Sequence, residues 1–435
     1  MLLARARRPI VLVLATVAAL VLTLPAAAPA SAALPKAGAP WVTAQSVTGG
    51  TVTLSISWPR VKGATRYEVD LVASRSGKAL SGAQITRSSA TRTRSFAATK
   101  GTTQKARLTR LKPGTVYCVV VRGLRGPRTV GPRSAPHCRM TTERDRAATK
   151  GRERLAVATY NVCSGCASGK LPAWGPSRAA RVADRIARLT VGTSKRRADV
   201  VTIQEGDRAL AENEERGDLE NALAGTFTRG CKPGDGTGDA YDNNVGVLLR
   251  DATLTAVPGT AGGMTFEAFD DDATHGACWV EARSRATGRT YAFVGLHVDE
   301  RAGADANRKR ETAAVHAAVT KALPGRTVIY AGDTNSSRSR NVDGPRIALA
   351  GKGYDDAYDV ALRYQSHPHQ NSAIGTSGTM RTSTLWGDHI DRVLVPRGVT
   401  VTAWKVDHRL SSRTRYATPL ASDHDPVIVE LRLPR

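Results

Sequence analysis

After its first 32 residues the sequence contains no long hydrophobic run, which excludes a later membrane-spanning helix, since such a helix needs roughly 20 apolar residues. Aromatic residues make up only 5% of the 435-residue chain, and six cysteines are too few for a fold held together mainly by disulfides. We therefore expect domains with hydrophobic cores of their own, in which the cysteines act as local staples.

The N-terminus has the pattern of a secretory signal peptide. Arg5, Arg7 and Arg8 precede an apolar run over residues 10–24, and Ala30-Ser31-Ala32 provides small residues for cleavage. The pattern predicts a signal peptide over residues 1–32 and export of the mature protein. An uncleaved signal anchor is the alternative, disfavoured by the short apolar core. An extracellular compartment permits disulfides.

Acidic residues are scarce in the first part of the mature chain. Residues 33–152 contain 23 Lys and Arg but four Asp and Glu, a net charge of +19, whereas residues 153–435 carry only +3. Such asymmetry favours a polyanionic partner: nucleic acid, an anionic cell-wall polymer or an acidic lipid surface. A role in solubility alone is equally compatible with so diffuse a charge.

Residues 38–142 show the alternation of short antiparallel strands. Val52, Leu54, Ile56 and Trp58 alternate with polar residues, and turn residues separate the runs. Trp58 and the stretch Leu-Lys-Pro-Gly-Thr-Val-Tyr ending at Tyr117 resemble the core tryptophan and tyrosine corner of a fibronectin type III domain. The resemblance implies an all-β sandwich with Cys118 and Cys138 bonded across neighbouring strands. No catalytic constellation occurs here.

Residues 143–153 are charged and small and predict a linker, after which strands and helices alternate over residues 154–435. Apolar strands are expected at residues 155–160, 200–203, 245–249, 292–296 and 328–331. We expect a helix capped by Ser177 and running to Leu189. A second helix between the last two strands has Val315, Val319 and Leu323 in one stripe.

Polar residues follow four of these predicted strands where each strand ends, and two more polar motifs come later in the chain. Polar groups at the ends of buried strands converge on one rim of a layered fold. Each of them alone is weak evidence for a site. Together they supply carboxylates, amides and imidazoles, a donor set that favours magnesium or calcium over zinc. The residues are Asn161, Glu205, His297, Asp333, Asn335, Asp391, Asp423 and His424.

Six motifs carry a second resemblance, in family order: T-Y-N (Asn161), I-Q-E (Glu205), G-L-H (His297), G-D-T-N (Asp333, Asn335), H-I-D-R-V (Asp391) and S-D-H-D-P-V (Asp423, His424). They resemble the endonuclease/exonuclease/phosphatase superfamily over residues 155–435. The resemblance implies a four-layer α/β sandwich, with two mixed β-sheets face to face and helices outside.

The resemblance also implies roles. Glu205, with Asn161 and Asp423, would hold Mg²⁺, or Mn²⁺ or Ca²⁺ in its place. Asp391 would orient His424, while Asp333 and Asn335 would position water and phosphate; the proton acceptor is either His424 or Asp333. His297 would act on the leaving-group side as an acid or hydrogen-bond donor. A histidine at this position disfavours the apurinic-endonuclease branch.

We therefore expect a secreted, metal-dependent phosphodiester hydrolase, with a nuclease acting on DNA or RNA as the first hypothesis. A sphingomyelinase or an inositol-phosphate or phosphoinositide phosphatase is the second, disfavoured because the low aromatic content leaves no hairpin suited to inserting in a bilayer. A non-catalytic polyanion-binding protein is the third. His275, His316, His367, His369 and His408 are expected at the surface or in loops, although His367 and His369 could line the cleft.

Cys163 and Cys166 follow Asn161 directly and form a Cys-x-x-Cys pair. A redox centre is disfavoured by the oxidising compartment, and zinc by the isolated positions of Cys231 and Cys278. Of the three pairings that these four cysteines allow, we prefer Cys163–Cys166 with Cys231–Cys278. Some relatives carry an acidic ligand at the Cys163 position. If the strand continues, Cys163 would face the cleft together with Asn161.

Overall fold

The structure, a computed structural model, describes residues 33–127, 129–142, 153–206, 209–210, 217–231, 244–266, 275–340, 342–380, 388–412 and 414–434. The predicted signal peptide and residues 143–152 of the predicted linker lie outside these ranges. Residues 34–435 group into one compact unit. No helix of the described residues is long and apolar enough to cross a membrane.

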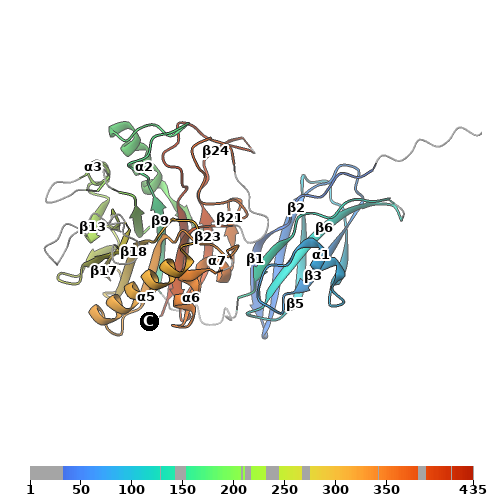
Figure 1. Ribbon diagram of the computed structural model, residues 1–435, viewed down its shortest axis with the longest axis horizontal. Helices are drawn as coiled ribbons and strands as arrows, with labels where there is room; N and C mark the ends of the chain where they lie inside the picture. Colours follow the sequence, from blue (N-terminus) through green and yellow to red (C-terminus); the bar gives the residue numbers. More distant parts are fainter. Residues whose placement is uncertain are drawn as a thin grey trace, which may run out of the picture. The chain divides into compact units, whose positions relative to one another are not determined.

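The first domain is a sandwich of two antiparallel sheets (Figure 1). One sheet has the order β1-β2-β5, and the other β4-β3-β6-β7 with β8 also on β6. The strands are β1 (Trp41–Thr48), β2 (Thr51–Pro59), β3 (Arg66–Ala73), β4 (Arg92–Ala97), β5 (Thr103–Leu111), β6 (Val116–Arg125), β7 (Thr129–Val130) and β8 (His137–Met140), with one short helix, α1 (Gly82–Arg87).

The core of this domain confirms the fibronectin-like prediction. Trp58 is fully buried and meets the edge of Tyr67 at 5.4 Å between ring centroids. The Tyr117 hydroxyl accepts a hydrogen bond from the Lys112 main-chain N–H at 3.0 Å, which closes the tyrosine corner. Cys118 and Cys138 are directly opposite each other on β6 and β8 and are bonded.

The second domain contains two mixed seven-stranded sheets. The first sheet has the order β13-β14-β12-β9-β26-β23-β21, and the second has β15-β17-β18-β19-β22-β20 with β16 also on β17. The first comprises β9 (Glu153–Asn161), β12 (Val200–Gln204), β13 (Phe227–Cys231), β14 (Gly246–Arg250), β21 (Tyr364–Gln365), β23 (Thr400–Val406) and β26 (Val427–Leu433). The second comprises β15 (Leu254–Ala256), β16 (Gly262–Thr265), β17 (Gly276–Ser284), β18 (Thr290–His297), β19 (Val328–Asp333), β20 (Tyr354–Asp356) and β22 (Asp391–Pro396).

Helices cover the outer faces of both sheets, which gives the predicted four layers (Figure 1). Helices α2 (Pro176–Arg188) and α3 (Asp218–Ala222) cover the first sheet, and α5 (Asp305–Ala322) and α6 (Gly344–Ala350) cover the second. The short helix α7 (Ala357–Val360) instead contributes to the core between the sheets. Two short hairpins complete the domain, β10 (Thr190–Val191) with β11 (Arg196–Arg197) and β24 (Leu410–Ser412) with β25 (Arg415–Tyr416).

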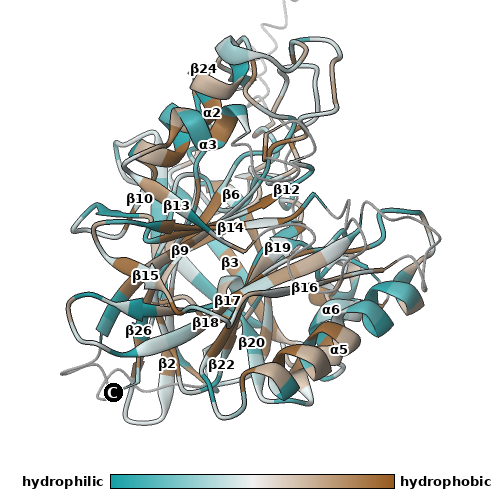
Figure 2. Cartoon of the chain, turned by 90° about the vertical axis from the view of Figure 1, so that its left-hand side faces the viewer, coloured by the Kyte–Doolittle hydropathy of each residue, from teal (hydrophilic) through white to brown (hydrophobic). Residues whose placement is uncertain are grey.

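Strand alternation explains why the layers form. On β9, Leu155 and Val157 point into the core between the sheets, whereas Ala156 and Ala158 face the core under α2. Figure 2 shows hydrophobic and hydrophilic residues alternating along α2, and Val182 and Ile186 form its buried stripe. Cys231 on β13 is bonded to Cys278 on β17, so this disulfide joins the two sheets.

The predicted helices are present, with one correction. Helix α2 begins at Pro176 with Gly175 as its N-cap, so the prediction of Ser177 as the cap is wrong. Proline fits the first helical position because its missing N–H would have no partner there, and this places the start before Ser177. On α5, Val315 and Val319 are buried as expected.

The two domains share buried polar contacts. The Gln45 side chain on β1 donates to the carbonyls of Asp359 (3.1 Å) and Ala361 (2.9 Å). The Arg139 guanidinium on β8, only 1% exposed, lies over the Tyr358 ring at 3.4 Å and the Tyr364 ring at 4.5 Å. The contact surface therefore resembles a domain interior.

Candidate active site

Strand register aligns three of the predicted residues at one end of the second sheet. His297 is opposite Asp333 in the β18–β19 pair, and Asp333 is opposite Asp391 in the β19–β22 pair. On the first sheet, Asn161 is opposite Gln204 in the parallel β9–β12 pair, and Glu205 follows directly. The polar ends of both sheets therefore meet, as the sequence predicts.

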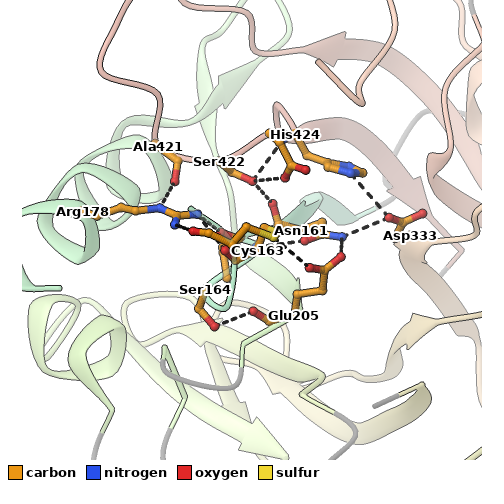
Figure 3. The surroundings of a disulfide bond; sticks show 12 residues. Asn161, Cys163, Ser164, Arg178, Glu205, Asp333, Ala421, Ser422 and His424 are labelled. Carbon is orange, nitrogen blue, oxygen red and sulfur yellow. Dashed lines mark hydrogen bonds and ion pairs between the residues drawn. A yellow bond between two sulfur atoms is a disulfide. The ribbon is translucent and has the colours of Figure 1, made fainter. Parts of the chain in front are cut away.

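Asn161 connects the two sheets. It is fully buried, and its side-chain N–H groups donate to Glu205 Oε1 at 2.7 Å and to Asp333 Oδ2 at 3.1 Å (Figure 3). Its amide oxygen accepts the Cys163 main-chain N–H at 3.0 Å. This oxygen keeps a second lone pair after that bond, so Asn161 as an oxygen ligand of the metal stays a prediction. Its amide N–H groups also orient two carboxylates.

Glu205 lies just beyond β12 in a left-handed backbone conformation, with φ of 51°. A non-glycine residue there costs about 1–2 kcal/mol, so the surroundings must hold it. Ser164 does so, because its N–H (2.9 Å) and its hydroxyl (2.7 Å) both donate to the Glu205 carbonyl. Burial raises the pKa of the Glu205 carboxyl, an effect that a bound cation would oppose.

His424 and Asp391 form a buried pair, with 2.8 Å between His424 Nδ1 and Asp391 Oδ2. His424 Nε2 then lies 3.8 Å from Asp333 Oδ2. Burial by itself would lower the pKa of His424, but the Asp391 carboxylate, with Asp423 and Asp333 nearby, raises it well above its ordinary value. The predicted orientation of His424 by Asp391 is therefore present as a hydrogen bond.

His297 is 5% exposed, with its Nε2 3.4 Å from Asn335 Nδ2 and 3.9 Å from Glu205 Oε1. Burial lowers the pKa of His297 to about 4, and the neighbouring His275 ring acts in the same direction. The imidazole is therefore neutral at physiological pH, and of its two predicted roles this favours hydrogen-bond donor over acid. Asn335 also donates to the Val298 carbonyl at 2.8 Å.

Asp333 accepts the Asn335 main-chain N–H at 2.8 Å, which closes the turn of the G-D-T-N motif. Asp423 is half-buried and joins the cluster less directly. Its main-chain carbonyl accepts N–H groups of Ile374 (2.7 Å) and Gly375 (2.8 Å), while its carboxylate accepts the Ser422 hydroxyl at 3.3 Å. Its charge nevertheless contributes to the raised pKa of His424.

The donor set fits a hard divalent cation, because one amide of Asn161 holds two carboxylate oxygens near each other within a mostly buried site. Asp391 is hydrogen-bonded to His424, whereas Glu205, Asp333 and Asp423 have no such bond to a histidine among the described residues, so these three are the candidate carboxylates to hold the ion. Cys163 and Cys166 also lie beside Glu205, but they are bonded to each other and offer no thiolate.

Cys163 does not continue β9. It adopts φ of 43°, and the strand ends at Asn161, so the conditional expectation that Cys163 faces the cleft as a strand residue is not met. The preferred pairings Cys163–Cys166 and Cys231–Cys278 are both present. The disulfide closes the loop that directly follows Asn161.

Two of the other histidines lie in loops, as predicted, but they are buried there. His275 is 3% exposed, and the His408 ring is fully buried with its Nδ1 2.7 Å from Asp425 Oδ2. Neither has a sequence pattern that marks it as buried. His369 stacks on Trp41 of the first domain, with ring centroids 4.6 Å apart, so one residue of the predicted cleft-lining pair contacts the first domain.

Sequence reasoning also missed the residues that support the site. Ser372 accepts the Asp391 main-chain N–H at 3.2 Å, and Ser422 donates to the Asn161 carbonyl at 2.7 Å. Arg178 lies beside the loop of the disulfide (Figure 3). The sequence does contain an indication of the role of Arg178. This residue precedes Val182 by four residues, so it lies on the apolar stripe of α2, where a charged side chain is unexpected.

Two family models match the chain. Residues 158–424 match the Endonuclease/Exonuclease/phosphatase family, and residues 37–142 match the model described as Interferon-alpha/beta receptor, fibronectin type III. A search of curated proteins finds no match.

Solved structures of this fold resemble the second domain. An endonuclease/exonuclease/phosphatase family protein from Bacteroides thetaiotaomicron is 19% identical, with 65% of this chain and 99% of that chain covered and a TM-score of 0.48. The mannosyl-6-phosphatase of the same organism is 18% identical (64% and 99% covered, TM-score 0.46). TDP2 of D. rerio, complexed with single strand DNA product, is 16% identical (64% and 99% covered, TM-score 0.44).

Proposed function

Because the chain belongs to the Endonuclease/Exonuclease/phosphatase family, we propose that it is a secreted, divalent-metal-dependent phosphodiester hydrolase that acts on nucleic acid. The observation that carries the proposal is the cluster at the ends of the two sheets, in which Asn161 bridges Glu205 and Asp333 beside the His424–Asp391 pair. This arrangement combines a carboxylate site for a cation with a histidine that a second carboxylate holds in place.

Glu205 and Asp423 would hold the metal, which when bound would neutralise the charge on the non-bridging oxygens of the phosphate. Asn161 keeps Glu205 and Asp333 in place by donating to both. Asp391 fixes the His424 ring so that Nε2 is directed toward Asp333, 3.8 Å away. Water and phosphate would bind between these two groups, and one of them takes the proton from water.

His297 and Asn335 adjoin Glu205 and each other, and they supply a neutral imidazole and an amide. Donors that are already held in position can stabilise a departing oxygen without further reorganisation. Asn335 is held by its bond to the Val298 carbonyl, and His297 by its place at the end of β18.

Nucleic acid is proposed as the substrate because residues 33–152 carry a net charge of +19. A polyanion would bind such a surface by counterion release, with an affinity that falls as salt rises. An anionic cell-wall polymer or a lipid surface would be bound by the same electrostatic attraction. Export is supported by the signal-like residues 1–32 and by three disulfides.

The test is a substrate panel on the purified chain. Plasmid DNA, single-stranded DNA, RNA, sphingomyelin and soluble phosphate esters are each assayed with Mg²⁺, Mn²⁺ or Ca²⁺ and again with EDTA. We expect metal-dependent cleavage of a nucleic acid that EDTA abolishes. His424→Ala should lower the rate at least 100-fold, whereas His316→Ala, on the outer helix α5, should leave it unchanged.

Cleavage of only a lipid or a small phosphate ester would refute the proposal of a nuclease, but it would still agree with a metal-dependent phosphoric ester hydrolase. Activity that survives both EDTA and the loss of His424 would refute the assignment of the site.

A further inference from the structure

Arg178, in the first turn of α2, is only 1% exposed, and each of its five N–H groups has a hydrogen-bond partner. All five acceptors are main-chain carbonyl oxygens. Nε donates to Ala421 (2.8 Å), Nη1 to Cys166 (2.7 Å) and Pro172 (3.1 Å), and Nη2 to Val162 (2.7 Å) and Cys163 (2.9 Å). One buried side chain therefore has no donor left for any other partner.

These acceptors belong to two loops that carry the site. Four of them lie in the loop that follows Asn161, and the fifth, Ala421, lies two residues before Asp423 (Figure 3). Ser422 makes a second connection between the loops by donating to the Asn161 carbonyl at 2.7 Å. Arg178 therefore connects the loop beside Glu205 to the loop that bears Asp423 and His424.

The first loop is itself held on its other side. The Cys163–Cys166 disulfide closes it, and the Ser164 N–H (2.9 Å) and hydroxyl (2.7 Å) both bind the Glu205 carbonyl. Glu205 adopts its left-handed backbone, φ 51°, at this point. A conformation of this kind persists only where the surroundings over-determine it, and the loop supplies those bonds.

Among the described residues, no carboxylate is directly bonded to the Arg178 guanidinium, since main-chain carbonyls accept all five of its N–H groups. Buried cations are ordinarily paired, and here the interacting carboxylates are those of Asp423 and Glu205. A fixed positive charge behind these two groups offsets their mutual repulsion and helps to keep both near the site in the absence of an ion.

We propose that Arg178 is a positioning residue for the metal site. Together with the Cys163–Cys166 loop, it sets the separation of Glu205 from the Asp423–His424 segment, and this separation determines how tightly a divalent cation binds. The inference rests on the proposed function, in that Glu205 and Asp423 are taken as the metal carboxylates. Arg178 contacts neither substrate nor ion.

The test compares Mn²⁺ binding by the full chain and two variants, followed by the electron paramagnetic resonance signal of free Mn²⁺. Arg178→Lys keeps the charge but not the planar set of five donors, so it separates geometry from charge. We expect its Mn²⁺ affinity to fall 10- to 100-fold, as when residues that support metal ligands are changed. Arg188→Lys is the matched control, because the Arg188 side chain lies at the end of the same helix and is 76% exposed. This variant should bind Mn²⁺ as tightly as the parent does.

Activity against the metal concentration gives a second readout. We expect Arg178→Lys to need more metal for half-maximal rate, with most of the maximal rate recovered at saturation. If this variant does not fold, as judged by metal-free thermal unfolding, Ser164→Ala replaces it, because it removes one bond to the Glu205 carbonyl. It should weaken Mn²⁺ binding by a smaller factor.

Unchanged Mn²⁺ affinity in the folded Arg178→Lys or Ser164→Ala protein would overturn the inference, as would an absence of Mn²⁺ binding by the parent chain. Weakened Mn²⁺ binding in a chain that cleaves no phosphate ester would support the positioning role and refute the proposed function, so the two failures are distinguishable.

Discussion

Replacing Asp343 by asparagine would test whether the buried ion pairs behind Asp391 stabilise the fold as strongly as their geometry indicates. Asp343 is 3% exposed and accepts a bidentate contact from Arg392, at 2.6 and 3.1 Å, while Arg392 also donates to Asp356 at 2.7 Å. Burial alone would raise the pKa of Asp343, but the Arg392 guanidinium lowers it to about 2 from its ordinary value of 3.8.

The size of the effect follows from this shift. Each pKa unit corresponds to about 1.4 kcal/mol, so the charged Asp343 carboxylate contributes roughly 2 kcal/mol to the free energy of unfolding at pH 7. Because the folded pKa lies below the unfolded one, the contribution is complete above pH 3.8 and is lost as the pH falls through about 2. By this relation about half of it remains at pH 3.

The assay is urea unfolding of the parent and Asp343→Asn at pH 7 and pH 3, followed by tryptophan fluorescence. We expect the variant to be less stable by roughly 2 kcal/mol at pH 7 and by about half of that at pH 3. Asp184→Asn is the control, because Asp184 pairs with Arg188 on the surface, where such pairs contribute at most about 1 kcal/mol. A difference as small as that of Asp184→Asn, or one that does not shrink in acid, would refute the reasoning.

Two further changes test the packing of the strands and of the domains. Gly332→Ala should destabilise the fold by about 1–3 kcal/mol, because a Cβ there would overlap the Leu296 carbonyl oxygen on β18. Gly351→Ala is the control, because a Cβ at that position meets open space. Equal urea unfolding midpoints for the two variants would contradict the prediction. Arg139→Ala should lower the free energy of unfolding by about 3 kcal/mol and separate the unfolding transitions of the two domains in calorimetry. Replacement of the exposed Arg107 by alanine is the control and should do neither. A single, unshifted transition in Arg139→Ala would count against a stabilising interface.

Local patterns were sufficient to predict most of the fold. Period-two alternation over residues 51–58 and the spacing of Val315 and Val319 report which faces are buried, and burial is what forms the layers. Most of the site residues could be predicted because they stand at or next to strand ends, and strand register then places His297, Asp333 and Asp391 side by side.

The remainder depends on contacts between residues far apart in the chain, which leave no local pattern. Gln45 bonds to Ala361 across 316 residues, and His408 to Asp425 inside a loop region that reads as polar. The orientation of the Asn161 amide could not be predicted from the sequence either, because it depends on the Cys163 N–H and on two carboxylates from different parts of the chain.

The buried contacts of Arg139 and Gln45 limit how freely the two domains can be recombined with other domains during evolution. A fibronectin-like module that recombines freely must present a surface that needs no particular neighbour. Here, exchange of the first domain alone would leave the Tyr358 and Tyr364 rings without the guanidinium that covers them and the Ala361 carbonyl without its donor. Descendants of this protein are therefore expected to keep both halves together, with changes at residues 45 and 139 accompanied by changes at residues 358–364.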